Sequence, residues 1–218
     1  FDTIIIPGNC PQLEDTIRKI MKSDLTVGSN FNGLNTQKGL WKLIVDHRWT
    51  VTSGAPYILH PMEVASIVGT MTDDREILAA AVLHDTVEDT DTTLDEIREH
   101  FGRRVELLVM TETEEKRYEL PAADTWELRK EESLIILENT QDIGVKMLWL
   151  GDKLSNMRSF AREYRRRGNE LWQNFNQKDP SKQAWYYRKI ADCLSQLDGY
   201  DAYSEYVSLV DYVFNAYN

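Results

Sequence analysis

Apolar residues recur every three to four positions along most of this chain, which is the spacing expected of helices packed against a core. Only residues 3–6 suggest a strand. The pattern predicts a series of helices, over residues 36–48, 61–71, 74–88, 93–101, 104–110, 126–139, 142–160, 184–197 and 206–214. An all-α fold in a single domain is therefore expected.

Local signals mark where some of these helices begin and end. Pro61 suits the first position of a helix, because proline lacks the N–H that goes unused there. Thr93 and Glu96 form a capping-box pattern, and Gly102 is expected to end the helix that they begin. Residues 114–125 are dense in charge, so we expect an exposed loop there.

Composition narrows the function classes. The 218 residues carry 36 acidic against 25 basic side chains, a net charge of −11, which repels nucleic acid and anionic lipid. With a mean hydropathy of −0.48, no stretch approaches the ~18 apolar residues that a membrane helix needs. The apolar first six residues lack a basic leader and do not resemble a signal peptide. Cys10 and Cys193 are expected to be free thiols, which indicates a reducing, cytoplasmic location.

A cluster of ionisable residues follows the apolar run 77–83. His84 lies four residues before Glu88, and Asp85 lies three residues before Glu88 and four before Asp89, which places all four around one helix end. Carboxylates so close together repel one another, and a divalent metal ion would compensate their charge. A solvated acidic helix end, capped by the histidine, would explain the same residues.

Two further segments favour the metal site. Asp152 and Asn156 share a helix face after a second apolar run, and His60 stands between a turn and a helix start. Each alone is most often structural. Together, two histidines and two aspartates form a mixed nitrogen and oxygen ligand set, which suits Mn, Fe or Zn better than Ca.

The order of these residues resembles the HD superfamily of metal-dependent phosphohydrolases. Three segments, residues 54–61, 83–96 and 151–158, are similar to the alarmone hydrolases, which comprise the hydrolase domain of Rel/SpoT enzymes and the stand-alone small hydrolases. The resemblance implies a helical bundle over residues 35–218, preceded by a segment of unknown role, residues 1–34. Nothing in the chain resembles the synthetase half of Rel/SpoT enzymes.

The resemblance also implies roles for individual residues. It assigns Mn(II), or another divalent transition metal, to four ligands: His60, His84, Asp85 and Asp152. It assigns Glu88 and Asp89 to the attacking water, and Asn156 to the substrate side. The implied reaction, which belongs to the stringent response, removes pyrophosphate from the 3′ position of ppGpp or pppGpp and leaves GDP or GTP. The implied partner is thus a small nucleotide, and the oligomeric state stays open.

The chain departs from the family on the nucleotide side. Val51 and Thr52 stand where the family has a basic pair that holds the nucleotide, and Arg48 is a candidate substitute. Lys182 and Tyr186 match a basic-then-aromatic substrate pair, although Tyr186 equally suits a packed core. Two alternatives therefore stay open: a phosphohydrolase acting on another nucleotide, such as a 5′-nucleotidase, and a nucleotide-binding module without catalysis.

Overall fold

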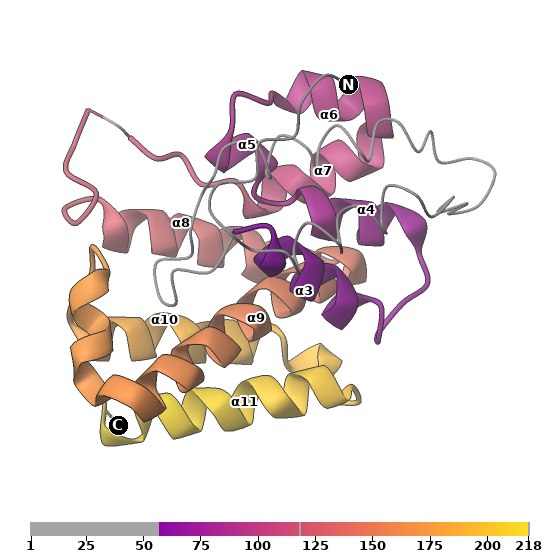
Figure 1. Ribbon diagram of the computed structural model, residues 1–218. Coiled ribbons are helices and arrows are strands. Elements are labelled where there is room, and N and C mark those ends of the chain that lie inside the picture. The colour runs from indigo at the N-terminus through magenta and orange to yellow at the C-terminus, as the bar shows by residue number, and fades with distance from the viewer. Residues whose placement is uncertain (1–56, 118, 218) are drawn as a thin grey trace, which may run out of the picture.

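The structure, a computed structural model, describes residues 57–117 and 119–217, and every regular element in these ranges is a helix (Figure 1). The α-helices are α3 (Leu59–Val68), α4 (Arg75–Leu83), α5 (Thr86–Asp89), α6 (Leu94–Phe101), α7 (Arg103–Glu112), α8 (Trp126–Asn139), α9 (Ile143–Arg167), α10 (Pro180–Cys193) and α11 (Asp201–Phe214). The 3-10 helices are η1 (Gly168–Asn174), η2 (Ser195–Leu197) and η3 (Asn215–Tyr217). The expected all-α fold is confirmed for this part of the chain.

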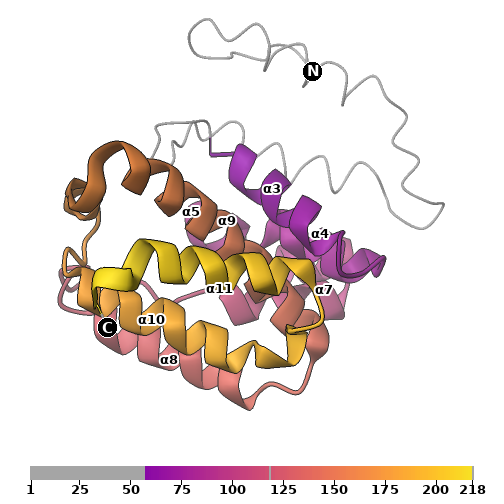
Figure 2. The ribbon, with the colours of Figure 1, turned by 90° about the horizontal axis from the view of Figure 1, so that it is seen from below.

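Helix α9 is the central element of the molecule. It contacts α3, α4 and α7 on one side and α11 on another, while α10 joins α11 to α8 (Figures 1 and 2). Leu148, Leu150 and Leu154 of α9 are fully buried. A polar side chain on this helix is therefore held in a rigid, largely apolar surrounding.

A glycine lets α3 lie close to α9. A Cβ atom on Gly151 would fall 2.6 Å from Val68 Cγ2 and 3.3 Å from Val64 Cγ1, both on α3. Because glycine has no Cβ, the two backbones can approach without this clash. The close contact brings the first turn of α3 beside the residue that follows the glycine, Asp152.

The helix predicted over residues 74–88 is wrong in one respect, because it is two helices. Asp74 caps α4 by accepting hydrogen bonds from the N–H groups of Glu76 and Ile77, and α4 ends at Leu83. His84 and Asp85 form a turn before α5 begins. The helical periodicity continues through the turn, so apolar spacing alone does not reveal the break.

Of the other predicted helix boundaries, some are confirmed and some are shifted. α8 has the predicted bounds, and the capping box of Thr93 and Glu96 is present. Gly102 ends α6 with a φ of +91°, a conformation that other residues rarely adopt. α3 begins two residues before Pro61, which therefore lies within the first turn, and α9 runs past residue 160 to its end at Arg167.

The loop between α7 and α8 is irregular, as predicted, but only part of it is exposed. Residues 119–124 are exposed, whereas the side chain of Glu114 is 13% exposed. The correction has a simple cause, because Glu114 finds basic partners on α8 that lie far along the sequence.

Several predictions fall outside the described residues. These are the strand at residues 3–6, the helix at 36–48, the boundary at residue 34 and the environments of Cys10, Arg48, Val51 and Thr52.

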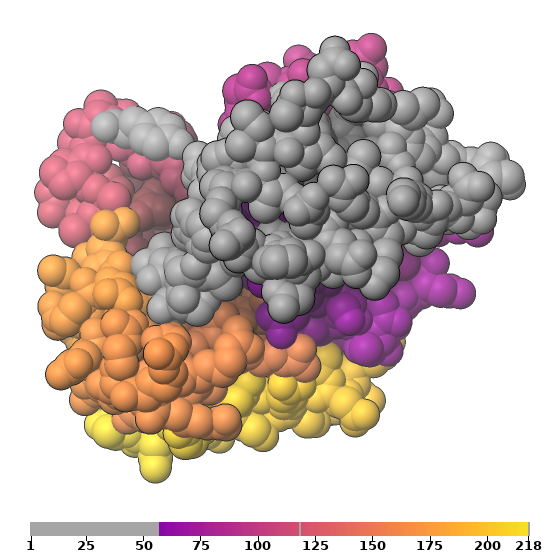
Figure 3. Space-filling model, viewed as in Figure 1, coloured from indigo at the N-terminus to yellow at the C-terminus, as the bar shows by residue number. Residues whose placement is uncertain are grey.

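Cys193 is a half-buried free thiol. None of the described helices is long and apolar enough to cross a bilayer. On the face shown in Figure 3, the C-terminal helices in orange and yellow lie beside α3 and α4 in indigo and purple.

Candidate metal centre

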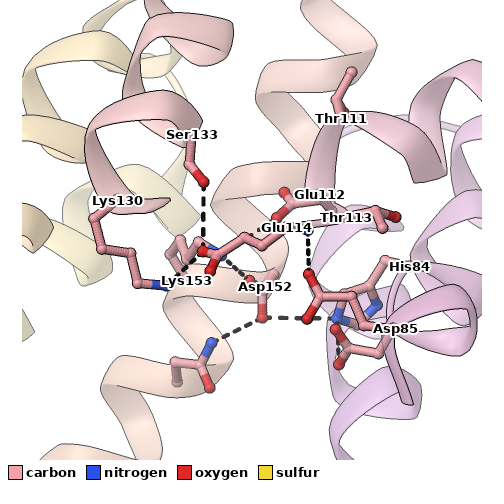
Figure 4. A network of polar contacts seen from close by, with 12 residues as sticks. His84, Asp85, Thr111, Glu112, Thr113, Glu114, Lys130, Ser133, Asp152 and Lys153 are labelled. Atoms are coloured by element: carbon pink, nitrogen blue, oxygen red, sulfur yellow. Dashed lines mark hydrogen bonds and ion pairs between the residues drawn. The ribbon is translucent and has the colours of Figure 1, made fainter. Parts of the chain in front are cut away.

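Four predicted ligands meet where α3, α4, α5 and α9 come together. His60 lies in the first turn of α3, and His84 and Asp85 form the turn between α4 and α5. Asp152 projects from the buried middle of α9 toward them (Figure 4). The break after α4 is important for the site, because it directs both His84 and Asp85 toward the same point.

The donor atoms of these side chains converge. The Nε2 atoms of His60 and His84 are 3.2 Å apart. Asp152 Oδ1 lies 3.0 Å from His60 Nε2 and 3.7 Å from His84 Nε2. Asp85 Oδ2 lies 2.9 Å from His84 Nε2 and 3.5 Å from His60 Nε2. Two imidazole nitrogens and two carboxylate oxygens thus face one another around a common point.

The other nitrogen of each imidazole is held by the protein. His60 Nδ1 lies 3.0 Å from Ser155 Oγ, and this hydroxyl donates to Glu63 Oε2 at 2.8 Å. His84 Nδ1 lies 2.9 Å from the carbonyl oxygen of Ala81. Such partners fix the ring orientation of metal-binding histidines and leave Nε2 for the ion.

The two carboxylates also have partners on their outer sides. The Tyr57 hydroxyl donates to Asp85 Oδ2, and the Lys153 ammonium pairs with Asp152 Oδ2. Asn156 donates to Asp152 Oδ1 at 2.8 Å. The sequence pattern assigns no role to Tyr57 or Lys153, although both lie within the segments 54–61 and 151–158 that carry the family resemblance.

The electrostatics of the cluster favour a bound cation. Burial acts to lower the pKa of His60, but hydrogen bonds to Asp152 and Asp85 raise it to about 9. The pKa of His84 is also raised, because Asp85 and Asp152 outweigh the effect of burial. The pKa of Asp85 is lowered by the two histidines despite its burial. The buried carboxylate of Asp152 and the partly buried carboxylate of Asp85 therefore need positive charge at the shared point, from protons on the imidazoles or from a metal ion.

The residues fit a divalent transition metal. Ligand atoms of His60, His84 and Asp85 all lie within 4.8 Å of one another, and Asp152 Oδ1 contacts both histidines. A mixed set of neutral imidazoles and carboxylates is suited to such ions. Four protein ligands leave coordination positions for water and substrate.

Glu88 and Asp89 lie on α5, one turn beyond Asp85. Glu88 accepts a hydrogen bond from the Glu114 N–H and pairs with the Lys116 ammonium. Burial raises the pKa of Glu88, while Lys116 and the Glu114 N–H act in the opposite direction. The Asp89 N–H donates to the carbonyl oxygen of Asp85 at 2.9 Å, which fixes α5 directly behind the ligand turn.

Lys153 connects the metal centre to a second acid. Its ammonium pairs with Asp152, lies 3.3 Å from Glu112 Oε2 and stands 4.7 Å above the ring of Trp149. Burial raises the pKa of Glu112 to about 7, with Lys153 opposing the shift. No local sequence pattern distinguishes Glu112, whose partner lies on another helix.

The residues predicted on the substrate side lie in different surroundings. Asn156 contacts Asp152, as above. Lys182 is 44% exposed and pairs with Glu127 at 2.6 Å, at a groove of about 290 Å³ between α8 and α10. Tyr186, one turn later, is 2% exposed, and the Lys130 ammonium lies 4.8 Å from its ring centre. Arg48 lies outside the described residues.

Comparison with known proteins adds a family and several relatives. The sequence profile of the HD domain matches residues 43–180. A stretch of 111 residues is 43% identical to human guanosine-3′,5′-bis(diphosphate) 3′-pyrophosphohydrolase MESH1, covering 50% of this chain and 58% of that protein. A stretch of 109 residues is 41% identical to an enzyme of the same activity from Aquifex aeolicus, covering 49% and 15%. The chain thus matches less than two thirds of the length of these relatives.

Two solved structures are similar. The protein lmo0812 from Listeria monocytogenes EGD-e superposes with a TM-score of 0.62 at 31% identity, covering 72% of this chain and 99% of that one. A metazoan ortholog of SpoT, described as hydrolysing ppGpp, superposes with a TM-score of 0.57 at 22% identity, covering 86% and 98%. The second likeness supports the fold.

Proposed function

Because this chain belongs to the HD domain family, we propose that it is a metal-dependent phosphohydrolase that cleaves ppGpp and pppGpp. Water and ppGpp give GDP and pyrophosphate, and pppGpp gives GTP and pyrophosphate. The observation that carries the proposal is the convergence of His60, His84, Asp85 and Asp152, with Glu88 and Asp89 one turn away. The relatives with 41–43% identity that bear the pyrophosphohydrolase name support the substrate.

His60, His84, Asp85 and Asp152 would hold the ion, and Mn(II) is the proposed metal. When bound, a divalent ion supplies Lewis-acid activation of water and neutralises charge on a phosphoryl group. Ser155 and the Ala81 carbonyl keep the imidazoles oriented, and Lys153 and Tyr57 keep the carboxylates in place. The ligand geometry is thus set by the protein before an ion arrives.

The acidic pair of α5 handles the attacking water in this proposal. A carboxylate of Glu88 or Asp89 takes a proton from the water as its oxygen attacks the 3′ phosphorus. The bond from phosphorus to the 3′ oxygen breaks, and that oxygen receives a proton from the acid pair to become the 3′ hydroxyl of GDP or GTP. The partly buried position of Glu88 supports the assignment, because burial brings a carboxyl pKa closer to neutrality.

The substrate side is proposed to be formed by Asn156 next to the ligands, with Arg48, Lys182 and Tyr186 contributing. The groove at Lys182 is lined by Trp126 and Trp185, and also by Glu127 and Glu131, so Lys182 is the one lining cation that an anionic group could meet there. Lys182 would exchange its surface pair with Glu127 for the substrate.

A hydrolysis screen tests the proposal. The purified chain is incubated with Mn(II) and with ppGpp, pppGpp, their adenine analogues or nucleoside monophosphates, and an Asp85→Asn variant serves as control. We expect pyrophosphate from the guanosine substrates, only with metal and only from the unmodified chain. Phosphate from a monophosphate with ppGpp left intact would contradict the substrate, and ppGpp binding without any cleavage would contradict the activity.

A further inference from the structure

Glu88 is held in place by the loop that follows α7. One of its carboxylate oxygens accepts the N–H of Glu114, and the other pairs with the ammonium of Lys116. Both donors come from a segment far from α5 in the sequence. The orientation of Glu88 therefore depends on where this segment lies.

The side chain of Glu114 fixes the segment to α8 (Figure 4). Arg129 Nη1 lies 2.6 Å from Glu114 Oε2, and Lys130 Nζ lies 2.5 Å from Oε1. Ser133 adds a hydroxyl donor at 3.4 Å from Oε1. Three side chains of one helix thus hold one carboxylate, and no other carboxylate of residues 113–117 has such an anchor.

The loop alternates between inward and outward side chains. Glu114 is 13% exposed and Lys116 32% exposed, whereas Glu115 between them is 79% exposed and lies no closer than 3.8 Å to its nearest cation, on Arg117. Extended backbone places neighbouring side chains on opposite sides. Two adjacent glutamates therefore have entirely different surroundings, which provides a matched control.

The anchor is an ion pair between a carboxylate and two basic side chains. Burial acts to raise the pKa of Glu114, but Lys130 and Arg129 lower it to about 2. Burying such charges adds little stability on balance, because the cost of removing them from water offsets their attraction. Stability alone is therefore a weak reason for this cluster, and its link to Glu88 offers a better one.

We propose that Glu114 is a positioning residue, which through its anchorage on α8 holds Glu88 beside the metal centre by means of its own N–H and Lys116. The inference rests on the proposed function, in which the Glu88 carboxylate acts on the attacking water. No hydrogen bond or ion pair joins the four metal ligands to residues 113–117, so the anchor should act on turnover and leave metal affinity unchanged.

A double-mutant cycle tests whether Glu114 acts through Glu88. Glu114→Gln keeps the size of the side chain and removes its charge, and Glu115→Gln is the control. We expect Glu114→Gln to lower kcat by about 100-fold, the effect of a small misplacement of a reacting group. In a Glu88→Gln background, the same change should lower kcat by less than about twofold. An equal loss in both backgrounds, or a loss of Mn(II) affinity, would overturn the proposal.

A titration without turnover separates this inference from the proposed function. The carboxyl carbons of glutamate-labelled protein, loaded with diamagnetic Zn(II), are followed by NMR, and Glu88 is assigned from the Glu88→Gln spectrum. Glu88 faces Lys116 and the anionic Asp85. With the loop released in Glu114→Gln, the titration midpoint of Glu88 should move to higher pH. An unmoved midpoint overturns the positioning role even if ppGpp is cleaved, and a moved midpoint without ppGpp cleavage contradicts only the substrate.

Discussion

Two clusters of buried charge lie side by side in this molecule, and they differ in what they leave unsatisfied. Around Glu114, one carboxylate meets the basic side chains of Arg129 and Lys130. At the metal centre, Asp152 Oδ2 pairs with Lys153, but Asp152 Oδ1 and Asp85 Oδ2 meet imidazoles, which carry charge only when protonated. The first cluster is complete within the protein, whereas the second has donor atoms directed at a shared point.

The difference shows which cluster can take an ion. Arginine and lysine repel an added cation, and their partner carboxylate has no free charge to offer. A protonated histidine can instead lose its extra proton, and the neutral imidazole then presents a lone pair to the ion. Lys153 marks the border between the two regions, because its ammonium contacts Asp152 on one side and Glu112 on the other.

The largest expected effect comes from removing a ligand carboxylate. Asp85→Asn and Asp152→Asn should each reduce Mn(II) affinity by more than about 100-fold, since even the outer partners of metal ligands account for 10- to 100-fold. Titration calorimetry measures the affinity. Asp95→Asn, an exposed acid in the first turn of α6, is the control and should bind normally. Unchanged affinity in the Asp85 variant would contradict the ligand assignment.

The acidic pair of α5 should affect turnover and leave ion binding intact. Glu88→Gln and Asp89→Asn are each expected to lower kcat by about 100-fold, the lower range for loss of an acid or base, with the same Mn(II) affinity. Steady-state kinetics and calorimetry on the same preparations check this. Wild-type kcat in both variants would remove the pair from the mechanism.

Acid should weaken the cluster around Glu114 in a defined pH window. The pKa of Glu114 is lowered from 4.5 to about 2 on folding, so its stabilisation is complete above about pH 5 and declines as pH falls toward 2. The difference in unfolding free energy between the wild type and Glu114→Gln should shrink by about 2 kcal/mol between pH 7 and pH 3. Urea denaturation measures it, with Glu115→Gln as control. A gap that is independent of pH would refute the ion pairing.

The smallest effect concerns the nucleotide side. Arg129 and Lys130 are paired with Glu114, so the substrate phosphates depend on other cations. Val51 and Thr52 supply none. Placing Arg at Val51 and Lys at Thr52 should lower the KM for ppGpp by about tenfold, the contribution of one charged hydrogen bond. Because the added charges would bind the ground state and the transition state equally, kcat should stay the same. Glutamine at both positions is the neutral control, and an equal drop in KM there would argue against a charge effect.

The sequence predicts the metal centre better than the cluster around Glu114. His60, His84, Asp85 and Asp152 stand in short motifs at the ends of apolar runs, where local spacing and a family resemblance both apply. α8 was predicted with its observed bounds, because its apolar residues and loop borders are local signals.

Long-range partners explain what the sequence does not predict. Glu114 stands in a charge-dense segment that looks exposed, and its burial depends on Arg129 and Lys130, 15 and 16 residues away. The turn at His84 and Asp85 is hidden because the apolar pattern continues through it. Such features depend on how helices meet, which no local pattern records.

Anomalous diffraction from crystals grown with Mn(II) tests the comparison most directly. The account predicts one Mn peak between the Nε2 atoms of His60 and His84 and the carboxylates of Asp85 and Asp152, and none at Glu114. A structure with those four side chains apart, or a peak on the Glu114 cluster with none at the histidines, would contradict it.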